Sequence, residues 1–450
     1  MSASFDLAII GGGPAGYVAA ERAAHRGLRV LLAEHRHLGG VCLNEGCIPS
    51  KTMLHSAKLF HYAVHGAAYG VKAEQVTFDF EPVQARKSRI INQLRKGIAQ
   101  LMKKGKIEVR NEAARLAPEG GLLIDDEPVA ARDILLATGS APARPPIPGA
   151  DLPGVLDSTG ILECREAPRQ LVVIGGGVIG CEFACFFGSI GVPVTVIEML
   201  PEICPAVDAA IAKTLRRELA KKNITFHLNA KVDAITPDTV QFTVDSQSQM
   251  VERDLVLLAT GRTPNVAGLG LEARGVDFDR RGIRIDDRCG TNVPGVWAAG
   301  DVTGRVWLAH AASRMGEVVV NNLTGRPDRM RYHGVPGVIY TTPEVATVGW
   351  TEEQARAAGW PVQTAQWPMT ANGRYLAEHE DERGIVKVVL RTDTRAVVGV
   401  HMLGAACSEM IHGAAAMVEM ELRADEVKDL VFPHPTVSEV IRDAIWQSYP

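Results

Sequence analysis

Two apolar runs without polar alternation, at 7–10 and 171–174, are the clearest elements in the hydrophobic pattern. Continuous apolar runs of this length, each followed by a glycine-rich turn, are typical of buried strands. In both cases a helical stretch follows the turn, and a second apolar run closes the unit, at 30–33 and at 194–197. The pattern therefore predicts two strand–helix–strand units of an α/β protein.

The rest of the chain adds shorter elements of both kinds. Residues 81–104 have the period of an amphipathic helix, with one apolar stripe formed by Ile90, Ile91, Leu94, Ile98 and Leu101. Short strands are predicted within 107–131 and 224–258, together with a strand at 296–299 and a helix at 309–322. After Pro336 the pattern predicts an α+β module with strands near 338–340, 344–348, 385–390 and 397–403 and helices near 408–421 and 437–446.

The longest apolar stretch, Leu171 to Ile197, is long enough to be considered as a membrane span. Its five glycines before residue 189 and the acidic Glu182 in its middle favour a buried strand, a glycine turn and a packed helix instead. No basic leader precedes the strand that begins at Phe5, so no targeting segment is expected.

Composition narrows the classes of partner. The 450 residues include 48 Lys and Arg against 52 Asp and Glu, which gives a net charge of −4 with both signs interspersed. Neither a nucleic-acid partner nor a membrane is therefore expected. Eight cysteines in so long a chain do not form a secreted disulfide scaffold, and a cytoplasmic protein is expected. Six of them are expected to be unpaired and reduced, namely Cys164, Cys181, Cys185, Cys204, Cys289 and Cys407.

The two glycine-rich turns share one spacing, with Gly11, Gly13 and Gly16 in the first and Gly175, Gly177 and Gly180 in the second. An acidic residue, Glu34 or Glu198, follows the first glycine by 23 positions in both copies. Glycines of this pattern let a pyrophosphate approach the backbone at a helix N-terminus, and the acid accepts hydrogen bonds from ribose hydroxyls. The residues 135–139 and 257–261 repeat one another as well. A duplicated dinucleotide-binding unit is favoured over ordinary strands of one long α/β sheet.

Cys42 and Cys47 lie between the two glycine turns in the sequence and are separated by four residues. A disulfide that closes so small a ring contributes roughly 2 kcal/mol to stability, which is little for a chain of this length. Pro49 suits the start of a helix, and a thiol at a helix N-terminus has a lowered pKa that favours the thiolate. The alternative is two buried, inert cysteines. The neighbouring nucleotide turns favour a redox pair.

His434 precedes Pro435 and Thr436, and Glu439 follows. The segment reads as a capping box with Thr436 at the N-cap and Glu439 at N3. It equally places a carboxylate where it orients an imidazole that can shuttle protons near neutral pH. His61 and His65 have a spacing that could bind a metal ion, but no third ligand accompanies them, so no metal site is expected.

The order of these motifs makes the chain similar to the flavin-linked pyridine nucleotide–disulfide oxidoreductases, and most similar to their dihydrolipoyl dehydrogenase branch. Further segments that carry the resemblance are Thr138-Gly139, 261–265 with Gly261 and Arg262, Gly300-Asp301, 340–344 and 434–439. The resemblance covers essentially the whole chain. It implies an α/β fold of two Rossmann-like dinucleotide-binding domains and a C-terminal α+β dimerisation domain. The implied limits are 1–145 and 266–332 for the FAD-binding and central region, 146–265 for the NAD-binding domain and 333–450 for the dimerisation domain.

The resemblance also implies the cofactors and their residues. FAD is expected at the first glycine turn with Glu34, Thr138, Gly139 and Asp301, and with Lys51 near its ring system; His310 is expected near the flavin. NAD is expected at the second turn, where Glu198 would repel the 2′-phosphate of NADP and no arginine follows within 199–202. Glu182 is expected to pair with Lys51, and Gly261 and Arg262 complete the predicted cofactor-binding set.

The activity implied is oxidation of dihydrolipoamide, free or on a lipoyl domain of a 2-oxo acid dehydrogenase complex, with NAD⁺ as acceptor. Cys42 would meet the substrate, Cys47 would face the flavin, and His434 with Glu439 would come from the opposite subunit of a homodimer. Two alternatives stay open: a related NAD(P)H-dependent reductase of glutathione, a coenzyme A disulfide or a metal ion, and a non-catalytic flavoprotein redox sensor.

Overall fold

A computed structural model describes residues 4–448 of the chain. It forms two compact units, each made of three segments. Unit 1 consists of Met1–Thr52, Glu81–Ala143 and Gly261–Met330. Unit 2 consists of Met53–Phe80, Arg144–Thr260 and Arg331–Pro450. Each unit contains one of the two predicted glycine turns.

Unit 1 is built on a parallel sheet with the strand order β20-β7-β1-β2-β3. Its strands are β1 (Phe5–Ile10), β2 (Val30–Ala33), β3 (Glu108–Arg110), β7 (Ala131–Leu136) and β20 (Val296–Ala298). Residues 7–10 of β1 are all buried, because a parallel strand in the middle of a sheet is covered on both faces. The sheet therefore follows directly from the unbroken apolar run in the sequence.

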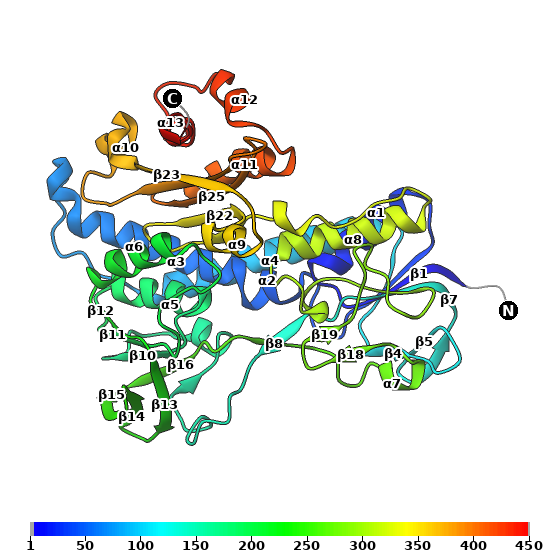
Figure 1. The fold of residues 1–450 in the computed structure, drawn as a ribbon. Coiled ribbons are helices and arrows are strands. Elements are labelled where there is room, and N and C mark those ends of the chain that lie inside the picture. Colours follow the sequence, from blue (N-terminus) through cyan, green and yellow to red (C-terminus); the bar gives the residue numbers. More distant parts are fainter. Residues whose placement is uncertain (1–3, 449–450) are drawn as a thin grey trace. The chain divides into compact units, whose positions relative to one another are not determined.

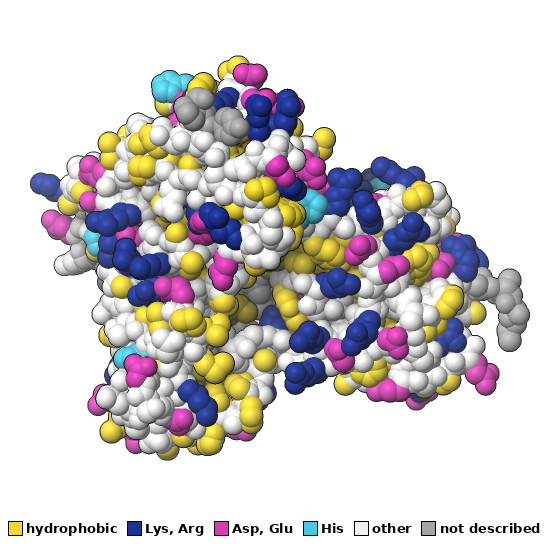
Figure 2. Space-filling view, in the orientation of Figure 1, with side chains coloured by type: hydrophobic (Ala, Val, Ile, Leu, Met, Phe, Trp, Pro, Cys, Tyr) yellow, Lys and Arg dark blue, Asp and Glu magenta, His cyan; other side chains and the backbone are white. Residues whose placement is uncertain are grey.

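Helices α1 (Pro14–His25) and α8 (Ala309–Leu323) pack side by side in unit 1 (Figure 1). A Cβ atom at Gly316 would lie 2.5 Å from the carbonyl oxygen of Ala15, so the absence of a side chain there permits the close approach. Figure 2 shows Lys and Arg side chains gathered over these two helices. Arg314 on α8 binds the carboxylate of Asp328 through two hydrogen bonds of 2.8 and 2.7 Å.

The remaining elements of unit 1 surround this sheet. An antiparallel sheet is formed by β4 (Ala114–Leu116), β5 (Leu122–Ile124) and β6 (Glu127–Val129), and two ribbons by β8 (Ser140–Pro142) with β17 (Arg262–Pro264) and β18 (Phe278–Asp279) with β19 (Gly282–Ile283). The helices are α2 (Gly40–Glu45), the start of α3 (Cys47–His65), α4 (Phe80–Lys104), α7 (Leu271–Arg274) and the 3₁₀ turn η3 (Asp301–Thr303). The predicted helix at 81–104 is confirmed, but only part of its stripe is buried: Ile91 and Ile98 are, whereas Leu94 and Leu101 are exposed.

The segment Arg144–Thr260 of unit 2 repeats the same design, with a parallel sheet of order β12-β11-β10-β16-β9. Its elements are β9 (Val155–Leu156), η2 (Gly160–Glu163), β10 (Leu171–Ile174), α5 (Val178–Ser189), β11 (Val194–Ile197), α6 (Ala209–Ala220), β12 (Ile224–His227) and β16 (Leu255–Leu258). An antiparallel sheet of β13 (Ala230–Ile235), β14 (Thr239–Val244) and β15 (Gln247–Glu252) packs its apolar face into the same core. The long apolar stretch is thus a strand, a glycine turn and a buried helix, as predicted.

The C-terminal part of unit 2 is an antiparallel sheet of order β21-β22-β25-β24-β23 with helices packed on it. Its strands are β21 (Gly337–Ile339), β22 (Val345–Gly349), β23 (Val362–Pro368), β24 (Ile385–Arg391) and β25 (Val397–Leu403). Its helices are α9 (Glu352–Ala357), α10 (Gly373–Glu378), α11 (Cys407–Glu419), α12 (Ala424–Asp429) and α13 (Glu439–Ser448), with η1 (Gly66–Tyr69), η4 (Tyr332–Gly334) and η5 (Met369–Ala371) as 3₁₀ turns of unit 2. The predicted α/β fold with a C-terminal α+β module is confirmed.

Candidate active site

The first glycine turn joins β1 to α1 and is held by its own acidic residue. Gly11 has a φ of +108°, and a Cβ at Gly16 would collide with the carbonyl oxygen of Gly11. Glu34, at the end of β2, accepts hydrogen bonds from the backbone N–H of Gly12 and of Arg36, both at 2.7 Å. The acid predicted to bind ribose is therefore fixed directly beside the turn.

The second turn has the same geometry. Gly175 has a φ of +107°, and a Cβ at Gly180 would collide with the Gly175 carbonyl oxygen. Glu198, at the end of β11, accepts hydrogen bonds from the N–H of Gly176 at 2.5 Å and of Leu200 at 2.8 Å. The predicted duplication therefore extends to individual hydrogen bonds.

Both turns end at a helix that is open to an anionic group. No side chain within residues 4–448 caps α1 at Gly13 or α5 at Gly177, and neither helix has an acidic residue in its first turn. The first backbone N–H groups of a helix carry partial positive charge and attract phosphate. Glycine turns, uncapped helix starts and neighbouring carboxylates together fit a dinucleotide in each unit.

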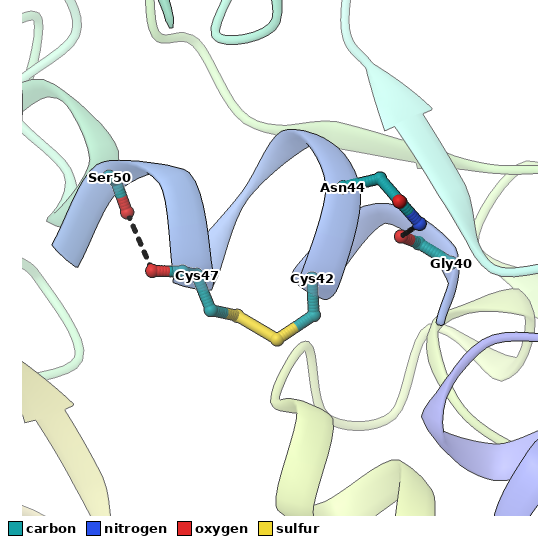
Figure 3. Close-up of a disulfide and its surroundings, with 5 residues drawn as sticks. All are labelled: Gly40, Cys42, Asn44, Cys47 and Ser50. Carbon is teal, nitrogen blue, oxygen red and sulfur yellow. Dashed lines mark hydrogen bonds between the residues drawn. A yellow bond between two sulfur atoms is a disulfide. The ribbon is translucent and has the colours of Figure 1, made fainter. Parts of the chain in front are cut away.

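Cys42 and Cys47 are joined by a disulfide, with their Cα atoms 4.7 Å apart. Cys42 lies on α2 and Cys47 is the first residue of α3, and Figure 3 shows the two side chains pointing toward each other across the break at Gly46. Both cysteines are half-buried, so the disulfide is accessible to a reactant. The alternative of two buried cysteines is therefore contradicted, because neither residue is buried.

Polar contacts hold the two helices around the disulfide. Asn44 donates from its side-chain amide to the carbonyl of Gly40 at 2.8 Å and accepts from Arg95 of α4 at 2.6 Å. The Ser50 hydroxyl donates to the carbonyl of Cys47 at 3.2 Å (Figure 3). Glu45 forms an ion pair with Arg36, which offsets the negative charge that this carboxylate adds near the disulfide. These contacts fix both helices, α2 and α3, around the disulfide.

The helix that carries Cys47 begins earlier than the sequence implied. Pro49 is its third residue rather than its first, because α3 begins at Cys47. The first turn of a helix needs no backbone donor, so proline is tolerated there as well. Cys47 is consequently at the helix N-terminus, where partial positive charge stabilises a thiolate.

Asp301 is the final acceptor of a hydrogen-bonded chain in unit 1. Ser140 donates its hydroxyl to Asp301 at 2.6 Å, and Arg262 donates to the Ser140 hydroxyl at 2.7 Å. Burial raises the pKa of Asp301, although the Ser140 hydrogen bond and the charge of Arg262 oppose this. Ser140 was missed by sequence reasoning; it follows Gly139 directly, and only the pairing of β8 with β17 brings it to Arg262.

The predicted Thr138-Gly139 and Gly261-Arg262 turns meet in the same part of unit 1. Thr138 donates its hydroxyl to the carbonyl of Asn265 at 2.7 Å, and the N–H of Asn265 donates to the carbonyl of Gly139 at 3.0 Å. Gly139 and Gly261 have φ values of +70° and +110°. At both positions the requirement for glycine is conformational: a positive φ is adopted readily by glycine and rarely by residues with a Cβ.

His434 and Glu439 are brought together at the start of α13. The Nδ1 atom of His434 lies 3.2 Å from both carboxylate oxygens of Glu439. The imidazole is largely exposed, whereas Glu439 is buried. The carboxylate also accepts from the N–H of Thr436 at 3.1 Å, and this hydrogen bond is the main reason why the pKa of Glu439 is lowered.

The capping-box expectation is half right. Glu439 bonds the backbone of Thr436, but α13 begins only at Glu439, and the Thr436 hydroxyl donates to the carbonyl of Pro433 at 2.7 Å instead. The cap and the histidine orientation are therefore served by one carboxylate rather than being alternatives.

Three further residues of the predicted cofactor sites lie on helices α3, α8 and α5. Lys51 lies half-buried on α3, His310 is exposed at the second position of α8, and Glu182 is buried on α5. Glu182 accepts a hydrogen bond from the N–H of Tyr340 at 2.9 Å. Lys51 and Glu182 belong to different units, and their pairing stays a prediction.

His61 and His65 stack on α3 with ring centroids 4.2 Å apart. Burial lowers the pKa of His61 to about 4. Among the described residues, His, Cys, Asp and Glu form no group of three or more that could hold a metal ion.

None of the helices described between residues 4 and 448 combines the length and hydropathy that a membrane crossing needs.

Comparison with known proteins agrees with this geometry. Residues 5–316 match the family model of pyridine nucleotide-disulphide oxidoreductases, and residues 335–445 match their dimerisation domain. The chain is 40% identical to dihydrolipoyl dehydrogenase 3 of Pseudomonas putida, covering 98% of this chain and 97% of the relative. It is 38% identical to a dihydrolipoyl dehydrogenase of Bacillus subtilis, with the same coverage.

A solved structure is similar over the whole chain as well. The HOCl-induced flavoprotein disulfide reductase RclA from Escherichia coli superposes with a TM-score of 0.86 at 31% identity, covering 98% of this chain and 99% of that one. Family match, relatives and the disulfide between two dinucleotide turns agree. The chain belongs to the pyridine nucleotide-disulphide oxidoreductases.

Proposed function

We propose that the protein is a dihydrolipoyl dehydrogenase, which oxidises dihydrolipoamide with NAD⁺. The observation that carries this proposal is the half-buried Cys42–Cys47 disulfide at the N-terminus of α3, in a chain with two dinucleotide turns. A disulfide in this position is accessible to a substrate thiol. The names of the relatives at about 40% identity point to the same substrate.

We assign FAD to the first turn and NAD to the second. FAD would be held by Gly11, Gly13, Gly16 and Glu34, with Lys51, Thr138, Gly139, Asp301 and His310 around it. NAD would be held by Gly175, Gly177, Gly180 and Glu198, with Glu182, Gly261 and Arg262 completing the cofactor sites. The corresponding domains are 1–145 with 266–332 for FAD, 146–265 for NAD and 333–450 for dimerisation. FAD bound at the first turn would supply two-electron redox chemistry between the reduced cysteine pair and NAD⁺.

The chain's own residues carry out thiol–disulfide exchange. A dihydrolipoyl thiolate attacks the sulfur of Cys42, and Cys47 leaves as a thiolate that the N-terminus of α3 stabilises. The second substrate thiol then attacks the substrate sulfur of the mixed disulfide, which releases Cys42 and forms the cyclic lipoyl disulfide. The substrate loses two electrons and two protons, and the enzyme gains the reduced pair.

His434 would accept the substrate protons. With Nδ1–H donating to Glu439, the imidazole has Nε2 free as a base. The lowered pKa of Glu439 keeps the carboxylate ionised, so it also stabilises the imidazolium that forms. We assign this role to His434 of the partner subunit, because the chain has the family's dimerisation domain and a homodimer is expected.

Glu198 determines the choice of cofactor in this proposal. Its carboxylate is buried and fixed by two backbone N–H groups, so it cannot move away from a 2′-phosphate. A second negative charge near such a group costs several kcal/mol when water is partly excluded. NAD is therefore preferred to NADP.

The substrate is carried by a lipoyl domain of a 2-oxo acid dehydrogenase complex or used free. The six free cysteines are consistent with a reducing compartment, and we place the protein in the cytoplasm.

A second candidate is a related disulfide reductase, favoured by the similarity to the Escherichia coli flavoprotein disulfide reductase. The deciding experiment compares kcat/KM for dihydrolipoamide with NAD⁺ against oxidised glutathione with NADPH. A higher value for glutathione would reject the proposed function in favour of the second candidate.

A further inference from the structure

A second pair of thiols lies close together in unit 2. Cys181 is the fourth residue of α5, and Cys204 lies in the loop that connects β11 to α6. Their sulfur atoms are 3.6 Å apart, and both side chains are buried. The catalytic disulfide does not involve either residue, and the mechanism above leaves the pair without a role.

Gly176 connects this pair to the second dinucleotide turn. Its carbonyl oxygen accepts from the N–H of Cys204 at 2.9 Å and lies 3.3 and 3.7 Å from the sulfur atoms of Cys181 and Cys204. The N–H of the same glycine holds Glu198. A change at the two thiols therefore acts on the turn and on its acidic residue through a single glycine.

The first turn shows that a thiol is not needed for this geometry. There the N–H of Gly39 donates to the carbonyl of Gly12 at 2.8 Å, which is the counterpart of the Cys204–Gly176 hydrogen bond. Gly39 has a φ of +99°, and Cys204 has a φ of +50°. A cysteine thus occupies a left-handed position that glycine adopts more readily. A strained residue that the backbone geometry does not require indicates a functional position.

Cys204 is buried, but its loop is at the surface. Met199, Pro201, Pro205 and Ala206 of this loop are exposed. Local opening of a surface loop needs less free energy than global unfolding, and it would admit a small oxidant to Cys204. The hydrogen bond to Cys204 and burial raise the pKa of Cys181, so in the closed loop this thiol stays protonated and oxidation is slow.

We propose that Cys181 and Cys204 are a site of reversible oxidation that forms a second, non-catalytic disulfide and weakens binding of NAD(H) at the second turn. With hydrogen peroxide, the Cys204 thiol becomes a sulfenic acid and water is released. The Cys181 sulfur then attacks the sulfenic sulfur, the S–S bond forms and a second water leaves. Two thiols and one peroxide give one disulfide and two waters, and a dithiol reductant reverses the change.

The effect on the turn follows from the distances. A disulfide requires the sulfur atoms to approach from 3.6 Å to about 2.05 Å. Both S–H donors to the Gly176 carbonyl disappear, and the loop that follows Glu198 is drawn toward α5. The coupling rests on the proposed assignment of NAD to the second turn, whereas formation of the disulfide does not.

The test uses the full-length protein with Cys42–Cys47 in its oxidised form, so that the catalytic thiols cannot react. The protein is treated with hydrogen peroxide, free thiols are blocked by alkylation, and unreduced peptides are identified by mass spectrometry. The expected product is a peptide that cross-links Cys181 to Cys204 and is lost after dithiothreitol. The dissociation constant for NADH, from titration, should rise by about fivefold or more, the usual scale of coupling between sites, while flavin content stays constant.

Three variants make the test specific. Cys204→Gly introduces the residue of the first turn, and Cys181→Ala removes the other thiol; both should bind NADH like the untreated parent and be insensitive to peroxide. Cys289→Gly is the matched control, because Cys289 is also buried at positive φ, +66°, but belongs to unit 1. It should leave peroxide sensitivity unchanged.

Absence of the cross-link in the parent protein would overturn the proposal. A cross-link without any change in NADH affinity would overturn its regulatory part. Peroxide sensitivity that persists in Cys181→Ala would show that another group is responsible and would equally overturn it. Failure of the proposed function is seen separately, as absent dihydrolipoamide oxidation by the reduced and untreated parent.

Discussion

In both dinucleotide turns the second glycine accepts a hydrogen bond from the N–H of a residue in a later loop, but the chain continues differently after that residue. In unit 1 the donor is Gly39, which is followed directly by α2, and a Cβ at Gly39 would lie 2.7 Å from a methyl carbon of Leu43. In unit 2 the donor is Cys204, and α6 begins only after Asp208, so the loop has room for the cysteine side chain. The duplicated framework is therefore kept, while the segment after it decides which cysteines are reactive and which are buried.

The two thiol pairs should differ most in catalysis. Cys42→Ser and Cys47→Ser should each lower dihydrolipoamide oxidation by about 10³-fold or more, because the nucleophilic exchange is lost. Cys204→Gly should leave it within about twofold in the absence of oxidant, because Gly39 provides the same backbone contact in the first unit. Steady-state assays of the three variants check this. Equal losses in all three would show that the comparison of reactive and buried pairs is mistaken.

His434 should act on the first thiol pair alone. His434→Gln should lower dihydrolipoamide oxidation by about 10²–10⁴-fold, the usual contribution of a positioned base. Reduction of an artificial acceptor by NADH should be retained, because it does not use the exchange reaction. Parallel assays of both activities test this, and loss of both together would indicate a structural role for the histidine.

The capping role of Glu439 is tested on the same segment. Glu439→Gln should have a smaller effect on catalysis than His434→Gln and a lower Tm than the parent at neutral pH. The folded-state pKa of Glu439 is lowered, so its stabilising effect is present above the unfolded value near 4.5 and is lost as pH falls through the folded pKa. The Tm difference between parent and variant should therefore narrow as the pH is lowered below about 4.5. A pH-independent difference would exclude the ionised carboxylate as its cause.

Subunit mixing tests whether His434 acts across the dimer. Inactive His434→Gln subunits are exchanged with inactive Cys42→Ser subunits. Partial recovery of dihydrolipoamide oxidation is expected, since one site of the mixed dimer then has both an intact disulfide and an intact histidine. No recovery, with subunit exchange verified by mass, would place both groups within one subunit.

Substitutions of Glu198 and Glu34 should affect different cofactors, nicotinamide dinucleotide for Glu198 and flavin for Glu34. Glu198→Arg should shift the ratio of kcat/KM for NAD⁺ and NADP⁺ toward NADP⁺ by at least about tenfold, because repulsion of the 2′-phosphate becomes attraction. Glu34→Arg should lower flavin content and leave that ratio unchanged in the flavin-loaded fraction. Flavin absorbance and kinetics with both nucleotides provide the measurement. The reverse outcome would exchange the two cofactor assignments.

The smallest expected effect concerns stability. Gly39→Ala should lower the free energy of unfolding by about 1–3 kcal/mol, through positive φ and the collision with Leu43. Cys204→Gly should change it by less than about 1 kcal/mol, because relief of strain is opposed by a more flexible unfolded chain. Chemical denaturation of both variants measures this. A larger loss for Cys204→Gly would mean that the thiol contacts outweigh the backbone strain.

The sequence alone determined the central parallel strands, the two glycine turns and the position of the cysteine pair, because these depend on local spacing. Unbroken apolar runs indicate buried parallel strands, and Cys42 and Cys47 are separated by only four residues. The same local information predicted that Glu439 would lie beside His434. The edge strand β23 and the short helices α9, α10 and α12 were not evident, because polar and apolar residues are mixed in them and tertiary packing stabilises them.

Tertiary structure decided every contact between residues distant in the chain. Ser140 reaches Asp301 and Arg262 only because β8 pairs with β17, 122 residues apart for the Ser140–Arg262 bond. In the sequence, Cys181 and Cys204 are two of six unpaired cysteines with no evident relation. In the structure, the loop after β11 packs against the start of α5 and brings their sulfur atoms together. Spacing in sequence carries no information about such contacts, since they arise when separate elements bury their apolar faces against one another.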